Sequence, residues 1–211
     1  PEGLSGNMIY NSDLFDLATI ARMMMHLERM LEGMCATPEA PLASLPLVTQ
    51  AELFDALALP TETYEQVSPL GPMQRDIYMD TLANPAGIQN SVGLVFAVTE
   101  PIDAEKWREA AQALHDAQPI MRTRMRASSV PYLEPAYQCV LRHDRAEVDV
   151  VDLPAGSSEA ATRQAIAGII QQPFDPHGRL VRHFLVRVAG GACLAGFANH
   201  HMLLDGIATT Q

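Results

Sequence analysis

The chain is organised around one stretch, Ala198-Asn199-His200-His201-Met202-Leu203-Leu204-Asp205-Gly206. Two adjacent histidines end an apolar run, and an aspartate and a glycine follow with the spacing HHxxxDG. The apolar runs 180–188 and 192–200 are joined by the small residues 189–191, a composition that favours a β-hairpin. The histidines are therefore expected at the end of a sheet strand, where rigid scaffolds often display catalytic groups.

Three interpretations of this motif are open from the residues alone. A histidine at a strand end can accept and return a proton near neutral pH, which suits attack by an amine or hydroxyl on a thioester or ester. Such a reaction needs no nucleophilic side chain if both substrates are positioned together, and the sequence contains no GxSxG segment. A metal site is the second interpretation, although no further cluster of ligands completes it. The third is a strand end followed by a turn, with no chemistry.

The composition disfavours several classes of function. The 211 residues are 48% hydrophobic and 18% charged, which is typical of a globular protein of one large or two small domains. The net charge is −11 and the basic residues do not cluster, so nucleic acid and anionic membranes are poor candidate partners. No apolar run approaches the roughly 20 residues that cross a bilayer, so we expect no membrane span.

The first residues and the cysteines indicate the setting of the chain. Pro1-Glu2-Gly3 is neither an initiator methionine nor the start of a signal peptide, so we expect a segment of a longer polypeptide. The three cysteines, Cys35, Cys139 and Cys193, are odd in number and far apart. This spacing argues against a disulfide framework and favours a reducing, cytoplasmic compartment.

The pattern divides the chain into three parts. Residues 1–36 contain a predicted amphipathic helix, capped by Ser12 and ended near Gly33, with apolar positions at Leu14, Leu17, Ile20, Met24, Leu27, Leu31 and Met34. Residues 37–63 form a proline-punctuated linker, in which Thr49 and Glu52 make a capping box for a short helix over 50–58.

Residues 64–211 alternate between helix-like and strand-like patterns. Helices are predicted from about 68 to 83, from Asp103 to 118, and from 158 to 172. Strands are predicted over 90–98, 121–130, 136–142, 148–153, 180–188 and 192–200. We therefore predict the α/β class, with a mixed β-sheet flanked by helices and preceded by the N-terminal helix and linker.

Four further segments accompany the HHxxxDG motif: Ser68-Pro69-Leu70-Gly71-Pro72-Met73-Gln74-Arg75, Met121-Arg122-Thr123-Arg124-Met125, Pro173-Phe174-Asp175 and Gly178-Arg179-Leu180-Val181-Arg182. Together these motifs resemble the condensation domains of nonribosomal peptide synthetases, which belong to the chloramphenicol-acetyltransferase-like superfamily. The resemblance covers about 64–211, the N-terminal lobe of such a domain. Residues 9–57 resemble the last helix and linker of another condensation domain, which implies a tandem arrangement.

The resemblance implies a reaction and a role for each motif residue. An acyl or peptidyl thioester on the phosphopantetheine of one carrier domain would meet an amine on a second carrier, with no cofactor or metal bound directly. His201 would act beside the amine as general base or positioning group, and His200 would be structural. Asp205 would shape the loop through a salt bridge, for which Arg122 is our candidate partner, and Gly206 would permit a close turn.

Departures from the family pattern, together with the tandem order, raise one alternative, and the HHxxxDG motif, which epimerisation domains share, leaves a second open. Ala117-Gln118 stand where the second motif has Arg-His, Met121 and Met125 replace leucine and phenylalanine, and Ile207-Ala208 follow the glycine. The first alternative is a non-condensing, interface-type platform that recruits a tailoring enzyme, such as the hydroxylases of siderophore synthesis. The second is an epimerisation domain. The parent domain is thus expected to be an acyl or peptidyl transferase, and this segment alone to be inactive, because family active sites lie between two lobes.

Overall fold

The structure is a computed structural model that describes residues 5–45, 47–98, 100, 102–130, 133–191 and 193–205. The chain forms two compact units, Pro1–Asp55 and Ala56–Gln211. The HHxxxDG motif belongs to the second unit.

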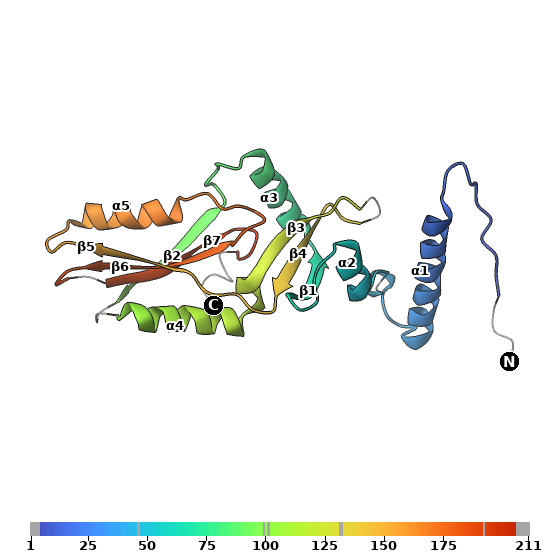
Figure 1. Ribbon diagram of the computed structural model, residues 1–211, viewed down its shortest axis with the longest axis horizontal. Helices are drawn as coiled ribbons and strands as arrows, with labels where there is room; N and C mark the ends of the chain where they lie inside the picture. The colour runs from blue at the N-terminus through green and yellow to red at the C-terminus, as the bar shows by residue number, and fades with distance from the viewer. Residues whose placement is uncertain are drawn as a thin grey trace. The chain divides into compact units, whose positions relative to one another are not determined.

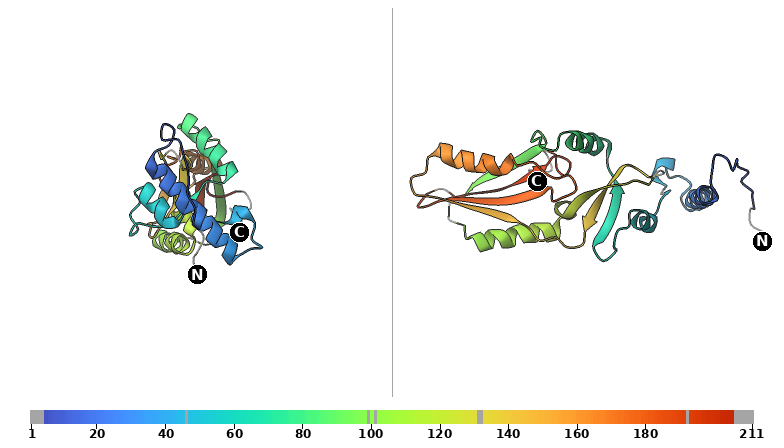
Figure 2. Two further views of the ribbon diagram at one scale, coloured as in Figure 1. Left: turned by 90° about the vertical axis from the view of Figure 1, so that its right-hand side faces the viewer. Right: turned by 45° about the horizontal axis from the view of Figure 1, so that its top comes forward.

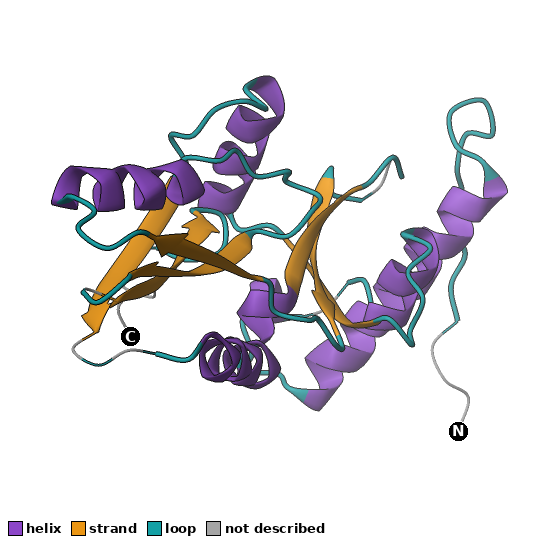
Figure 3. Cartoon of the chain, turned by 60° about the vertical axis from the view of Figure 1, so that its left-hand side comes forward, coloured by secondary structure: helices purple, strands orange, loops and turns teal. Residues whose placement is uncertain are grey.

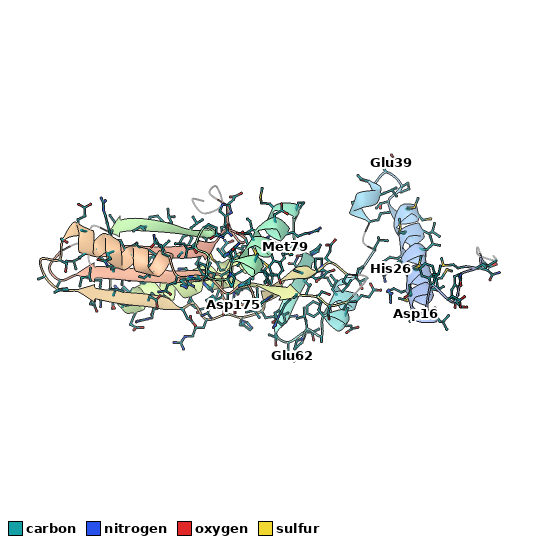
Figure 4. The ribbon with its side chains drawn as sticks, turned by 90° about the horizontal axis from the view of Figure 1, so that it is seen from above. Asp16, His26, Glu39, Glu62, Met79 and Asp175 are labelled. Atoms are coloured by element: carbon teal, nitrogen blue, oxygen red, sulfur yellow. The ribbon has the colours of Figure 1, made fainter. Side chains whose placement is uncertain are left out.

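The first unit is built on helix α1, Leu17–Ala36 (Figure 1). The prediction that Ser12 caps this helix is wrong. Asp16 is the cap, because its carboxylate accepts the free N–H of Thr19 at 2.6 Å; Figure 4 labels Asp16 at one end of α1 and His26 further along. Gly33 lies inside the helix, where its carbonyl accepts the N–H of Thr37.

Helix α1 exposes its predicted apolar stripe. Ile20 is its only buried residue among those described. The large apolar side chains that remain more than one-third exposed include Leu17, Met23, Met24, Met25, Leu27, Leu31 and Met34. A helix of this kind is stabilised mainly by packing of its apolar face, so α1 gains little of that stabilisation within the described residues.

The predicted capping box is confirmed at the start of α2, Gln50–Ala56, which follows the short 3-10 helix η1, Leu42–Ser44. The backbone N–H of Thr49 donates to the Glu52 carboxylate at 2.7 Å, and the N–H of Glu52 donates to the Thr49 hydroxyl at 3.2 Å. Arg29 of α1 pairs with Glu52 at 2.8 Å. The hydrogen bond from Arg29 is the largest cause that lowers the pKa of Glu52 to about 2.

The second unit contains two separate sheets (Figure 3). The smaller sheet is antiparallel, with the order β1-β4-β3, where β1 is Tyr64–Pro69, β3 is Thr123–Ala127 and β4 is Ala136–Leu141. The sequence pattern did not predict β1 as a strand. The strand expected from Met121 begins two residues later, because Pro119 starts the 3-10 helix η2, Pro119–Arg122.

The larger sheet is mixed, with the order β2-β7-β6-β5. Its strands β5 and β6 are parallel and the other pairs antiparallel. The strands are β2 Ser91–Val98, β5 Val148–Leu153, β6 Val181–Val188 and β7 Cys193–His200. Helices α5, Glu159–Ile170, and α4, Ala104–Ala117, lie on opposite sides of this sheet (Figures 1 and 2). The predicted mixed sheet flanked by helices is thus confirmed.

Strands β2 and β7 approach closely, and a glycine permits it. A Cβ atom added to Gly196 would lie 2.1 Å from the carbonyl oxygen of Leu94 and 2.7 Å from the ring of Phe184. Any side chain would force these strands apart. The close pairing carries the register unbroken from Val98↔Cys193 to Ser91↔His200, which fixes the first motif histidine at the end of the sheet.

Candidate active site

Three apolar residues anchor the motif loop that follows β7. Met202, Leu203 and Leu204 are 1%, 8% and 7% exposed and belong to the largest core cluster, which also contains Leu70 and Phe174. Burying these side chains holds the polar residues on either side of them in place. The loop is described up to Asp205; Gly206, for which a turn role was expected, lies outside the described residues.

His200 contacts other parts of the fold through both of its ring nitrogens. Its Nδ1 accepts the N–H of Met202 at 3.2 Å, and its Nε2 lies 3.1 Å from the hydroxyl of Thr81 in helix α3, Pro72–Ala83. The Thr81 hydroxyl donates to the carbonyl of Ile77 at 2.7 Å, so the shared hydrogen belongs to His200 Nε2. Burial, and then the neighbouring His201, lowers the pKa of His200 to about 4. The ring is neutral near pH 7 and both of its nitrogens are occupied.

His201 differs from its neighbour in each of these respects. Its side chain is exposed, and within the described part of the chain its ring nitrogens have no hydrogen-bond partner. Its backbone is fixed, because its N–H donates to the carbonyl of Asn90 at 2.8 Å. A held backbone with an unoccupied imidazole is what a proton acceptor for an incoming substrate requires.

The predicted first motif meets the histidine motif through Gln74. The side-chain amide of Gln74 donates to the carbonyl of Met202 at 3.0 Å and to Gln138 at 3.3 Å, while its oxygen accepts the N–H of Gly71 at 2.9 Å. Residues 128 positions apart are thereby joined. Gln74 both caps α3 and ties it to the loop after β7.

Arg122 is buried, at 6% exposure, and its contacts are structural. Its guanidinium donates to the carbonyls of His115, Leu141 and Arg142 and forms an ion pair with Glu65 at 3.3 Å. Asp205 is not among the partners of Arg122 in the described part of the chain. Arg122 therefore joins η2 to the end of β4, a role that the linear pattern did not predict.

The unusual methionines of the second motif fill the core. Met121 and Met125 are 6% and 0% exposed and lie in the same core cluster as Met202. Methionine is close in volume to leucine and adapts to irregular space, so these departures from the family pattern are compatible with normal packing.

The structure contains a buried charge cluster around Asp144 that the sequence pattern did not predict. Asp144 pairs with Arg124 at 2.7 Å and Arg179 at 2.9 Å, and lies 3.5 Å from Nδ1 of His115. Burial alone would raise the pKa of Asp144, but the contacts with His115, Arg179 and Arg124 lower it below its usual range. No periodic pattern marks a single aspartate in a connection between strands. The presence of Arg124 and Arg179 in two recognised motifs was the only available signal.

His115 also bonds to His183 of β6. Their Nε2 atoms are 3.0 Å apart, and the side chains are 0% and 2% exposed. Burial lowers the pKa of His183 to about 4, and the electrostatic effects of the neighbouring His115 and Arg179 side chains act in the same direction. His183 lines an apolar pocket of about 1070 Å³ beside α4, but neither His200 nor His201 does.

Two structural features bear on metal binding and membrane insertion: the grouping of possible metal ligands and the length of apolar helices. Across those ranges, no group of three or more His, Cys, Asp or Glu side chains is arranged to hold a metal ion. No helix in the described part of the chain is long and apolar enough to cross a bilayer.

The family model of the condensation domain matches residues 64–210. The chain belongs to the condensation-domain family. A 50-residue segment is 44% identical to one of the subunits of the linear gramicidin synthase of Brevibacillus parabrevis, covering 24% of this chain and 1% of that subunit. Neither finding favours the interface-type platform or the epimerisation domain.

Solved condensation domains share the fold. The starter condensation domain of rhizomide synthetase is 19% identical, with a TM-score of 0.60 over 68% of this chain and 34% of that one. The first condensation domain of the CDA synthetase is 16% identical, with a TM-score of 0.59 over 68% of this chain and 36% of that one. The chain thus spans about a third of these structures and a small part of the gramicidin synthase subunit.

Proposed function

We propose that residues 64–211 are the N-terminal lobe of a domain that forms amide bonds between two carrier-bound substrates. The donor is an acyl or peptidyl thioester on the phosphopantetheine of one carrier domain, and the acceptor is an aminoacyl group on another. The carrier domains and adjacent synthetase domains are then the partners, in the cytoplasm, and the lobe itself binds no cofactor.

The contrast between the two motif histidines supports this proposal. His200 has both ring nitrogens occupied by Thr81 and Met202, whereas the ring of His201 is exposed at the end of β7. In amide formation the amine nitrogen bonds to the thioester carbon, the carbon–sulfur bond breaks, and the amine loses a proton. His201 accepts that proton or holds the amine in position, and the thiolate that leaves is protonated in turn. Asp205 and Gly206 shape the loop that carries it.

The arrangement of the first 63 residues is a further part of the proposal. Residues 1–36 are the C-terminal helix of a preceding condensation domain and 37–63 the connector. The exposed apolar stripe of α1 supports this, because such a helix gains stability only when another surface covers it.

The test uses the complete domain with two loaded carrier domains. His201→Ala is expected to lower the rate of amide formation by roughly a hundredfold or more, because general base catalysis contributes about that much. His143→Ala is the matched control, since His143 is also exposed but lies between β4 and β5. An unchanged rate in His201→Ala would contradict the proposal. The 211-residue chain alone is expected to form no product.

A further inference from the structure

The carboxylate of Asp80 organises the connection between α3 and β2. It accepts hydrogen bonds from three side-chain amides: Asn84 at 3.1 Å, Gln89 at 3.0 Å and Asn90 at 2.8 Å. These donors come from both ends of the segment 84–90, so one anionic group closes the whole connection. The three hydrogen bonds also lower the pKa of Asp80, with that from Gln89 the largest cause.

The connection held by Asp80 is the one that holds His201. Asn90 uses its side chain to bond to Asp80 and its carbonyl to accept the N–H of His201 at 2.8 Å. The next residue, Ser91, begins the pairing of β2 with β7 opposite His200. Asp80 is therefore joined to the His201 backbone through a single intervening residue.

Consecutive residues of α3 hold the two histidines by different means. Thr81 bonds to the ring of His200, whereas Asp80 acts on the backbone of His201 through Asn90. We infer that Asp80 is a positioning residue: it fixes the backbone of His201 through Asn90, so that the unoccupied ring projects from a rigid point. Its effect on catalysis rests on the proposed function, but its effect on the His201 backbone does not.

The first measurement is amide hydrogen exchange of His201 in the 211-residue chain. Asp80→Asn keeps the size of the side chain but removes the charge and one of its two acceptor oxygens. We expect the His201 amide to exchange about tenfold faster, the change that corresponds to losing one hydrogen bond's worth of local stability. Asp76→Asn, one turn earlier on the exposed side of α3, is the matched control and should leave this rate unchanged.

A reciprocal variant separates positioning from general destabilisation. Asn90→Asp places two carboxylates against each other and should also speed exchange, whereas the double variant Asp80→Asn with Asn90→Asp restores a donor facing a carboxylate. The double variant should therefore recover most of the protection that each single variant loses. Equal exchange in Asp80→Asn and the unaltered chain, or no recovery in the double variant, would overturn the inference.

The second measurement is the kinetics of the complete domain with loaded carriers. Asp80→Asn should lower kcat by roughly tenfold to a hundredfold, since displacing a catalytic group by about 1 Å has effects of that size. KM for the carriers should stay the same. If His201→Ala leaves the rate unchanged, the proposed function fails, while the exchange result still decides the role of Asp80. An unchanged kcat beside a lost His201→Ala activity would overturn the catalytic part of the inference.

Discussion

The second unit contains two pairs of histidines with opposite arrangements. His200 and His201 are adjacent in sequence, and the strand end separates them, one ring into the core and the other into solvent. His115 and His183 are 68 residues apart, and the fold brings their Nε2 atoms to 3.0 Å in the interior. The first pair leaves one ring exposed, while the second contacts the charge cluster at Asp144 through His115.

The difference shows what makes a histidine available for chemistry. Three of the four rings are buried, and each of these has a polar partner that accounts for at least one nitrogen. Only the ring of His201 combines exposure with a fixed backbone. Residue type and even motif membership do not distinguish His200 from His201; the contacts of each ring do.

The largest expected effect is a loss of stability at low pH, caused by the buried histidines His183 and His200. The pKa values of His183 and His200 lie near 4 in the folded chain against 6.5 ordinarily, so the unfolded chain takes up protons first as pH falls. Their stabilisation is complete above pH 6.5 and is lost between pH 6.5 and 4, by about 3 kcal/mol for each ring. Urea denaturation between pH 7 and 5 measures the loss in free energy of unfolding at pH values above those at which carboxylates take up protons. A constant free energy of unfolding over that interval would contradict the burial argument.

Replacing one member of the buried pair His115 and His183 should lower the free energy of unfolding by somewhat less. His115→Leu or His183→Leu leaves the partner nitrogen unpaired in the interior, with an expected loss of about 2 kcal/mol in each case. The double variant should lose clearly less than the sum, because no unpaired imidazole remains. Thermal and urea unfolding of the four proteins complete the cycle, with exposed His143→Leu as control. Strict additivity would show that the two rings do not interact.

The smallest effects should separate His200 from His201. Thr81→Val removes the acceptor of His200 Nε2 without changing the side-chain shape, and should lower stability by about 1 to 2 kcal/mol. Thr81→Ser keeps the hydroxyl and should lose less. His201→Gln should change stability by less than about 0.5 kcal/mol, because its ring is exposed and unpaired among the described residues. A larger loss in His201→Gln than in Thr81→Val would reverse the assignment.

Much of the second unit could be predicted from local patterns. The hairpin β6–β7 and the helices α4 and α5 depend on neighbours in sequence, as does the capping box at Thr49 and Glu52 in the first unit, and the structure has all of them. The helix start at Asp16 instead of Ser12 was missed, because two nearby candidates for the cap differ only in local geometry. Strand β1 was missed because its pattern is irregular, and its partner β4 lies about 70 residues away.

The sequence by itself determined the motif and the class of fold. It could do so because strand periodicity and a short, rigid spacing are local properties of the chain. Only the tertiary structure decided that Arg122 meets Glu65, that Asp144 collects Arg124 and Arg179, and that Asp80 reaches His201 through Asn90. Those contacts join residues far apart in the chain, and their partners are set by how the helices and sheets pack.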